Sequence, residues 1–444
     1  MSSGFGYPEQ FEIRPYAGPP LSATVTVPGS KSITNRALVL AALGSYYSEC
    51  TLTGALRSED TEVMVDGLTR LGYPIECDWP TIRLKRQQVA LVPAKAADLY
   101  VANSGTTMRF LTALCALGRG RYRLDGVRRM RERPIEDLLA ALRQLGVGAI
   151  SETGNGCPPV IIESDGFFSS DSVWIRAGVS SQFLSALLMV APVPASGDPL
   201  VIRVLGPPVS EPYVSMTEVM LRRWGIPFSK SEDAEDTCYV FEMEAQAHYG
   251  KLSEYAIEPD ASAASYFWAA SAILGGRVTV SGLTEHSLQG DVRFVDLLHQ
   301  MGCRVEKCDS GITVHGGALR GIDVDMNDIS DTVMTLAAVA CFASGPTRIR
   351  NVAHIRHKET DRIVALATEL RRLGAVVEEF PDGLSITPLP LHGAEVETYN
   401  DHRMAMSLAL VGLKVPGVVI KNPGCVAKTY PGFWEDLKVL SPES

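Results

Sequence analysis

Six times in this chain, a short polar turn leads into a segment rich in Ala and Leu. The turns begin at Ser30, Asn103, Ser180, Asp260, Asp328 and Asn400, so the intervals are 73, 77, 80, 68 and 72 residues. A segment that is apolar on all sides predicts a buried helix. Only its N-terminus is polar, with unpaired N–H groups and about half a positive charge. We therefore expect six helix N-termini that form a site for a multiply anionic small molecule, and hence an enzyme.

Amphipathic segments alternate with the apolar ones, and each ends at a glycine. Gly72, Gly146, Gly225, Gly302 and Gly374 are 74, 79, 77 and 72 residues apart. A glycine after an amphipathic stripe is typical of the left-handed residue that ends a helix. The terminal FWEDLKVL resembles a sixth, shortened copy. Each repeat is predicted to contain a buried helix, a strand, an amphipathic helix and further strands.

The length of 444 residues predicts two domains, because single hydrophobic cores rarely grow so large. Six repeats then give three per domain. A polar, acidic stretch separates the third repeat from the fourth, and we place the crossover near residue 258. The predicted organisation is a discontinuous domain of residues 1–29 and 258–444, with residues 30–257 as an inserted domain. We expect the polar helix ends to face a cleft between them.

Composition argues against several classes of protein. No apolar run reaches the roughly 18 residues that span a bilayer, and MSSGFGYPEQFEIRP does not read as a secretory signal. Nine cysteines form no CxxC pair, which predicts a cytoplasmic protein without structural disulfides. A net charge of −10 with no long basic run argues against a nucleic-acid partner. The residue spacing implies neither a metal nor a cofactor.

The first half of the chain places cations and hydroxyl groups at helix starts. PGSKSITNR brings Lys31, Ser32 and Arg36 to one start, which suits a phosphate group. NSGTTMR contains Gly105, whose missing side chain lets an anion approach the backbone. VRRMRERP adds four arginines, of which we expect one or two to point inward. Neutral donors follow at Ser180, Ser181, Gln182 and Ser210. Each of these groups could instead be an ordinary helix cap or a solvated side chain.

The second half mixes carboxylates with cations. Asp260, Asp328, Asp331 and Asp401 stand at helix starts, where capping is the alternative reading. HIRHKETDR, NDHRMAM and GCVAKTYPGF add His354, Lys358, Glu359, Arg362, Arg403 and Lys428. Cations hold phosphate and carboxylate groups, and a carboxylate among them is available as an acid or base. The pattern favours proton transfer on a polyanionic substrate.

Taken together, the motifs resemble the EPSP synthase (3-phosphoshikimate 1-carboxyvinyltransferase) family from about Pro28 to Pro431. The matching segments, in order, are PGSKSITNRAL, NSGTTMR, RMRERP, SSQFLSALLM, EPDASAASYF, GDVRFVDLL, DISDTVMTLA, HKETDR, NDHRMAM and CVAKTYPGFW. The resemblance implies an α/β fold of two domains, each with three βαβαββ units around buried helices. It also implies transfer of the enolpyruvyl group of phosphoenolpyruvate to the 5-hydroxyl of shikimate 3-phosphate, in the shikimate pathway. No cofactor is implied, and the protein is expected to be a monomer that binds the inhibitor glyphosate.

The resemblance also implies residue roles. Asp331 is the expected base for the hydroxyl and Glu359 the proton donor to the methylene, with Lys31 and Lys428 also in the catalytic set. Shikimate 3-phosphate is expected to contact Lys31, Ser32, Arg36, Ser180, Ser181, Gln182, Ser210 and Lys358. Phosphoenolpyruvate is expected to contact Lys31, Gly105, Arg129, Gln182, Arg362, Arg403 and Lys428. His354 stands where an Asn that touches shikimate is common, while Ala102 and Phe110 replace a usual Gly and a frequent Pro.

Two alternatives stay open at this point. A sister transferase that acts on UDP-N-acetylglucosamine shares the fold and the donor, but has a Lys-Asn pair and a reactive Cys on a mobile loop. Here Ser32 follows Lys31, and Cys115 lies in an apolar run, where a thiol tends to be inert. A binding or scaffold protein without catalysis is the other alternative. The presence of Lys31, Asp331, Glu359 and Lys428 argues against it.

Overall fold

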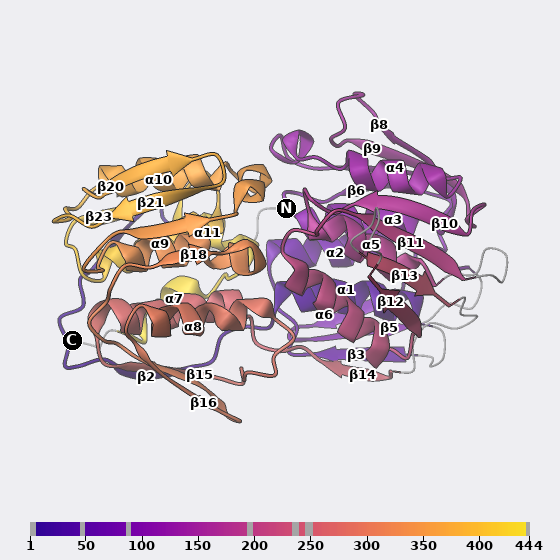
Figure 1. The fold of residues 1–444 in the computed structure, drawn as a ribbon. Coiled ribbons are helices and arrows are strands. Elements are labelled where there is room, and N and C mark those ends of the chain that lie inside the picture. Colours follow the sequence, from indigo (N-terminus) through magenta and orange to yellow (C-terminus); the bar gives the residue numbers. More distant parts are fainter. Residues whose placement is uncertain are drawn as a thin grey trace. The chain divides into compact units, whose positions relative to one another are not determined.

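The computed structural model describes residues 6–44, 49–85, 90–192, 199–232, 239–244 and 252–440. They form a mixed α/β fold with six small sheets. The chain divides into two compact units: residues 1–28 with 258–444 are unit 1, and residues 29–257 are unit 2 (Figure 1). No helix of the described residues is long and apolar enough to cross a membrane. Eight described cysteines are free, and Cys238 lies outside the described residues.

Unit 2 is built from three consecutive repeats. The first contains α1 (Lys31–Leu43), β3 (Glu49–Thr53), α2 (Glu59–Arg70), β4 (Ile75–Asp78) and β5 (Thr81–Lys85). The second contains β6 (Ala96–Tyr100), α3 (Gly105–Cys115), β7 (Arg119–Asp125), η1 (Met130–Glu132), α4 (Glu136–Gln144), β8 (Gly148–Ser151) and β9 (Val160–Asp165). The third contains β10 (Ser172–Arg176), α5 (Ser181–Val190), β11 (Leu200–Leu205), α6 (Glu211–Arg223), β12 (Phe228–Ser231) and β13 (Tyr239–Met243), and β14 (Glu254–Ala256) follows.

Unit 1 repeats the pattern after two leading strands, β1 (Gln10–Ile13) and β2 (Ser22–Val25). Its first repeat contains α7 (Ala261–Leu274), β15 (Arg277–Ser281), η2 (Gly290–Arg293), α8 (Phe294–Gln300), β16 (Arg304–Cys308) and β17 (Gly311–His315). The next contains β18 (Asp323–Asp325), η3 (Asn327–Thr332), α9 (Val333–Ala340), β19 (Thr347–Arg350), η4 (Ala353–His357), α10 (Arg362–Arg372), β20 (Val376–Phe380) and β21 (Gly383–Thr387). The last contains β22 (Glu395–Val396), α11 (His402–Gly412), β23 (Val418–Lys421), η5 (Pro423–Lys428) and α12 (Phe433–Lys438).

One rule of strand pairing explains why unit 1 is made of two separate segments of the chain. In a complete repeat, the strand before the buried helix pairs in parallel with the strand after it, as β6 does with β7 and β18 with β19. The first repeat of each unit lacks its own leading strand. In unit 2, β14 fills this place beside β3, and in unit 1, β2 fills it beside β15. Strand β1 adds to the last sheet of unit 1, antiparallel to β23.

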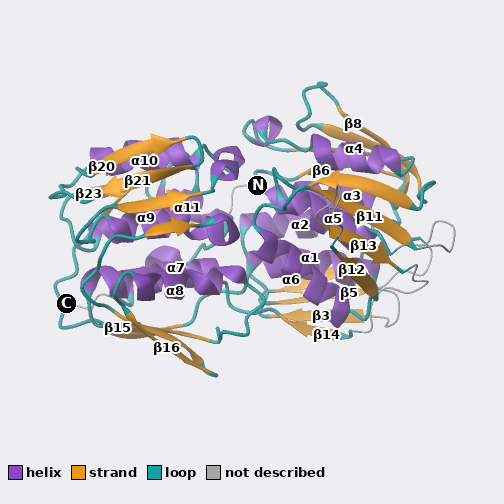
Figure 2. Cartoon of the chain, viewed as in Figure 1, coloured by secondary structure: helices purple, strands orange, loops and turns teal. Residues whose placement is uncertain are grey.

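The expected buried helices are present in both units. Helices α1, α3 and α5 in unit 2, and α7, α9 and α11 in unit 1, are almost entirely buried. Figure 2 shows helices with strands on either side of them in each unit. The five predicted stops, Gly72, Gly146, Gly225, Gly302 and Gly374, are confirmed: each has a positive φ, between 75° and 114°.

The predicted helix start at Asp328 is wrong. Residues 327–332 form the 3-10 helix η3, in which Ile329 has non-helical angles (φ −125°, ψ 38°), and α9 begins only at Val333. The Asp328 side chain is 51% exposed and forms an ion pair with Arg293 at 3.1 Å. The other predicted starts lie within two residues of the observed helices.

Polar contacts join the buried helices inside the core of unit 1. The Ser265 hydroxyl lies 3.1 Å from that of Thr335, which lies 3.3 Å from that of Ser407. The three side chains come from α7, α9 and α11 and are fully buried or nearly so. Hydroxyl groups that pair with one another fix the relative positions of helices whose apolar surfaces alone would specify them less well.

Candidate active site

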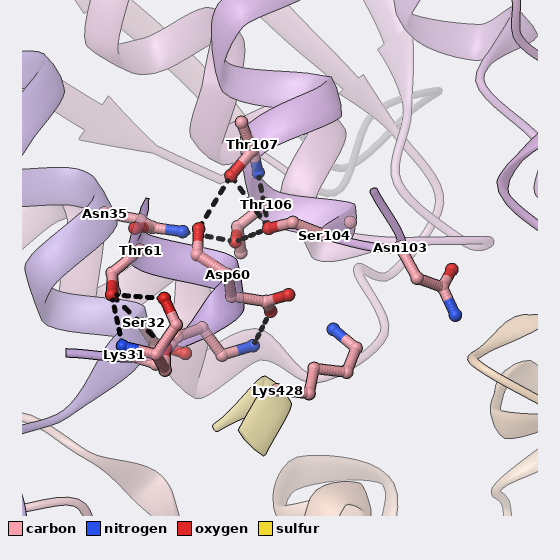
Figure 3. Close-up of polar contacts among 12 residues, drawn as sticks. Lys31, Ser32, Asn35, Asp60, Thr61, Asn103, Ser104, Thr106, Thr107 and Lys428 are labelled. Carbon is pink, nitrogen blue, oxygen red and sulfur yellow. Dashed lines mark hydrogen bonds and ion pairs between the residues drawn. The ribbon is translucent and has the colours of Figure 1, made fainter. Parts of the chain in front are cut away.

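The N-terminal parts of α1, α2 and α3 in unit 2 form a connected polar cluster (Figure 3). Lys31, in the first turn of α1, forms an ion pair with Asp60 of α2 at 3.4 Å, and the Asp60 side chain is 1% exposed. Asn35 of α1 donates its amide to the Thr106 hydroxyl of α3 at 2.7 Å. Ser104 caps α3 by accepting from the backbone N–H of Thr107. Thr107 of α3 donates to the backbone carbonyl of Asp60 at 3.2 Å, so α3 supports the residue that pairs with Lys31.

Arg36 links three helices of unit 2. Its guanidinium donates to the hydroxyls of Thr217 and Ser185 and to the backbone carbonyls of Ser32 and Tyr213, at 2.7 to 3.2 Å. The residue is 1% exposed, and burial lowers its pKa to about 10. The guanidinium thus already donates to four acceptors within the protein. The expected contact of Arg36 with a substrate stays a prediction.

Gly105 lies against a buried arginine that the sequence-based assignment did not select. A Cβ atom at Gly105 would lie 2.5 Å from Nη2 of Arg133 and 3.1 Å from Oε1 of Gln182. Arg133 is 4% exposed and donates to the backbone and side-chain oxygens of Asn103. The Arg129 side chain is 30% exposed and pairs with Glu132 at 3.1 Å. The structure thus brings Arg133, rather than Arg129, to Gly105.

The other predicted donors of unit 2 belong to α5 and α6. Ser180 caps α5 by accepting from the Gln182 N–H at 3.2 Å, and Ser181 is 6% exposed. Ser210 precedes α6 with a left-handed backbone (φ 52°) and is 3% exposed. Since Gln182 lies in the first turn of α5 and Gly105 begins α3, the N-terminal ends of these two helices meet in unit 2.

Unit 1 contains a compact array of three carboxylates and three cations. Arg362 of α10 is at its centre and bonds Asp401 at 2.8 Å, Glu359 at 2.9 Å and Asp331 at 3.2 Å. Two further cations complete the array: Arg403 lies 2.7 Å from Asp331, and Lys428 lies 3.3 Å from Glu359. Asp331 and Glu359 therefore each contact two cations, so both carboxylates are surrounded by positive charge.

The Asp401 side chain has a structural part in this array. It caps α11 by accepting from the Arg403 N–H at 2.9 Å, and both oxygens accept from Arg362. Burial lowers the pKa of Arg362, but Asp401, Glu359 and Asp331 outweigh this effect and raise the pKa above its ordinary value. The guanidinium is therefore a fixed charge that orients Glu359 and Asp331.

Two buried histidines beside the array are neutral. Burial lowers the pKa of His402 well below 6.5, with Arg403 adding to the effect. Burial and the Lys358 ammonium lower the pKa of His354 to about 3. A neutral imidazole offers one donor and one acceptor, so it can both donate and accept a hydrogen bond, as an Asn amide does.

Three charged groups of the site were missed by sequence reasoning. Asp60 looks like an ordinary acidic residue in a first helical turn, Arg133 is one of four neighbouring arginines, and Asp291 precedes an amphipathic helix. All three are 4% exposed or less. Charged side chains are rarely so deeply buried unless they are paired, but sequence spacing alone does not reveal burial.

The chain is similar in sequence and in fold to known proteins. The sequence profile of EPSP synthase (3-phosphoshikimate 1-carboxyvinyltransferase) matches residues 15–437. A 3-phosphoshikimate 1-carboxyvinyltransferase from Nostoc punctiforme is 50% identical over 422 residues, which cover 94% of this chain and 95% of the relative. One from Burkholderia vietnamiensis is 43% identical over 441 residues, which cover 98% and 99%. An EPSP synthase structure from Acinetobacter baumannii, with 24% identity, has the same fold, with a TM-score of 0.78 over 97% of this chain and 98% of the other.

The fold is of the mixed α/β type, its charge array combines buried carboxylates with cations, and its named relatives are enzymes. The sequence comparisons make the assignment specific, because the profile and the relatives extend over nearly the whole length. The chain belongs to the EPSP synthase family.

Proposed function

We propose that this protein transfers the enolpyruvyl group of phosphoenolpyruvate to the 5-hydroxyl of shikimate 3-phosphate and releases phosphate. The reaction is a step of aromatic amino acid biosynthesis. Membership of the EPSP synthase family supports the proposal. The observation that carries it is the array in which Asp331 and Glu359 are each held by two cations.

In this reaction, Asp331 accepts the proton of the 5-hydroxyl while that oxygen bonds to the substituted carbon of the enol. Glu359 gives a proton to the methylene carbon, which becomes a methyl group. The tetrahedral intermediate then loses phosphate, and a proton leaves the methyl group to restore the double bond. The phosphate and carboxylate groups of the substrates pair with the cations that otherwise neutralise Glu359. This carboxylate therefore takes up a proton more readily once the substrates have bound.

Binding is divided between the two units in this proposal. Residues 258–444 with 1–29 supply the catalytic carboxylates, and residues 30–257 supply the helix N-termini that bind phosphate and shikimate groups. Lys31, Arg362, Arg403 and Lys428 hold the anionic groups of the substrates. We add Arg133 to the phosphoenolpyruvate contacts, because its buried guanidinium lies against Gly105. The neutral His354 takes the place of an amide beside shikimate.

Phosphate release tests the proposal directly. With both substrates present, release should be rapid, and omission of either one should abolish it. A parallel reaction with UDP-N-acetylglucosamine as the acceptor tests the sister activity. The buried Cys115 argues against that activity, since burial raises the pKa of its thiol. Release that needs no shikimate 3-phosphate, or that occurs only with UDP-N-acetylglucosamine, would contradict the proposal.

The proposal includes three further properties: glyphosate competes with phosphoenolpyruvate beside Gly105, the protein is a monomer, and it acts in the cytoplasm. Raising the phosphoenolpyruvate concentration should relieve glyphosate inhibition, whereas inhibition that does not depend on this concentration would contradict competition. Light scattering should give a mass near 48.0 kDa, and a mass of twice this value would exclude the monomer.

A further inference from the structure

Arg403 is held from several sides in unit 1, and its Nη1 atom donates to the Tyr266 hydroxyl at 3.5 Å. Its Nη2 atom donates to Asp331 at 2.7 Å and to the hydroxyl of Ser262 at 3.3 Å. Ser262 lies in the first turn of α7, Asp331 lies in η3 before α9, and Arg403 lies in the first turn of α11. The guanidinium is therefore fixed where three buried helices of unit 1 begin.

Ser262 is oriented by a buried acid that has no assigned role in the reaction. Its hydroxyl donates to a carboxylate oxygen of Asp291, a residue of η2 that is 3% exposed. An ionised carboxylate only accepts hydrogen bonds, so the Ser262 proton points toward Asp291 and a lone pair of its oxygen faces Arg403. The hydrogen bonds run in one direction, from Arg403 to Ser262 and from Ser262 to Asp291.

We propose that Asp291 is a positioning residue that, through Ser262, keeps Arg403 in place for phosphoenolpyruvate. This inference rests on the proposed function. In that reaction Asp331 takes the proton of the 5-hydroxyl and loses its negative charge, so its hold on Arg403 weakens when the tetrahedral intermediate forms. Asp291 and Ser262 take no part in proton transfer, and their link to Arg403 persists through the cycle.

Substitution of Asp291 by Asn tests the direction of this hydrogen-bond chain. An amide also donates, so it allows the Ser262 hydroxyl to turn its proton toward Arg403, where two donors would oppose each other. Asp291→Asn should raise the KM for phosphoenolpyruvate about 10-fold, as expected for the loss of about 1.4 kcal/mol, and should leave the KM for shikimate 3-phosphate within about twofold. Asp328→Asn removes an exposed carboxylate from the neighbouring element η3 and is the matched control.

A double variant separates this inference from a general structural effect. Asp291 acts through Ser262, so Asp291→Asn combined with Ser262→Ala should raise the KM for phosphoenolpyruvate no more than Ser262→Ala alone. Multiplicative effects, an unchanged KM in Asp291→Asn, or equal rises for both substrates would overturn the inference while an active wild type upholds the proposed function. A wild type that does not turn over the two substrates would overturn both.

Discussion

The free energy of unfolding of Asp291→Asn, relative to that of the wild type, should rise as the pH increases from strong acid to neutral. Burial raises the pKa of Asp291 from 3.8 to about 6; Asp331 and Asp260 add to this rise, while Arg403 and Ser262 oppose it. The difference of about 2 units corresponds to about 3 kcal/mol, because one unit is about 1.4 kcal/mol. Between these two pKa values the folded chain binds more protons than the unfolded chain, so the free energy of unfolding falls as the pH rises from about 4 to about 6.

Asn carries no titrating proton, so the variant should escape this loss. Relative to its value in strong acid, the stability gain of the variant over the wild type should be about 1 kcal/mol at pH 4.5 and about 3 kcal/mol at pH 7.5, by linkage. Urea unfolding followed by circular dichroism measures the gain. Hydrogen exchange of the α7 amides assigns it to unit 1, since Ser262 and Asp291 hold the start of that helix.

The pH dependence of the gain is the decisive quantity, because a change of side chain alone adds a constant at every pH. Asp328→Asn, whose carboxylate is 51% exposed, should show no such rise. A difference between Asp291→Asn and the wild type that stays constant from about pH 4.5 to pH 7.5 would refute the reasoning. A gain in stability together with weaker phosphoenolpyruvate binding is the combination expected of a residue kept for function.

Asp331→Ala and Glu359→Gln should each lower kcat at least about 100-fold, as expected for the loss of an acid–base group; a rate within about twofold of wild type removes that residue from its assigned role. Arg403→Ala should raise the KM for phosphoenolpyruvate more than that for shikimate 3-phosphate, because the substrate loses a cation, and an unchanged KM counts against this contact. Arg133→Gln should raise the KM for phosphoenolpyruvate more than Arg129→Gln, since only Arg133 is buried against Gly105. Equal effects of the two substitutions contradict that placement.

The periodic features of the sequence predicted most of the fold. The five glycines at helix ends need no tertiary information, because a left-handed residue after an amphipathic stripe is a local requirement. The start of α9 was not predicted correctly, because it depends on tertiary contacts. An Asp before an apolar run looks the same whether it caps a helix or precedes a 3-10 turn, and here the pairing of Asp328 with Arg293 accompanies the second arrangement.

Motifs located the site, but they did not identify which charges are buried. Four arginines within six residues cannot be told apart from the sequence, yet Arg133 is 4% exposed and the Arg129 side chain is 30% exposed. Asp291 gives no local signal at all. Its burial depends on α7 and α11, whose starts meet only in the folded unit.

The pairing of β1 with a strand far along the chain sets the order in which the sheets can form during synthesis. Strand β1 pairs with β23, about 400 residues later in the chain, and a ribosome adds about 5–20 residues per second. The leading strand therefore waits about 20 to 80 s for its partner, while residues 29–257 can already fold around their own three sheets. During that interval the backbone groups of β1 lack their partner strand, so the last sheet of unit 1 can be completed only after β23 has been synthesised.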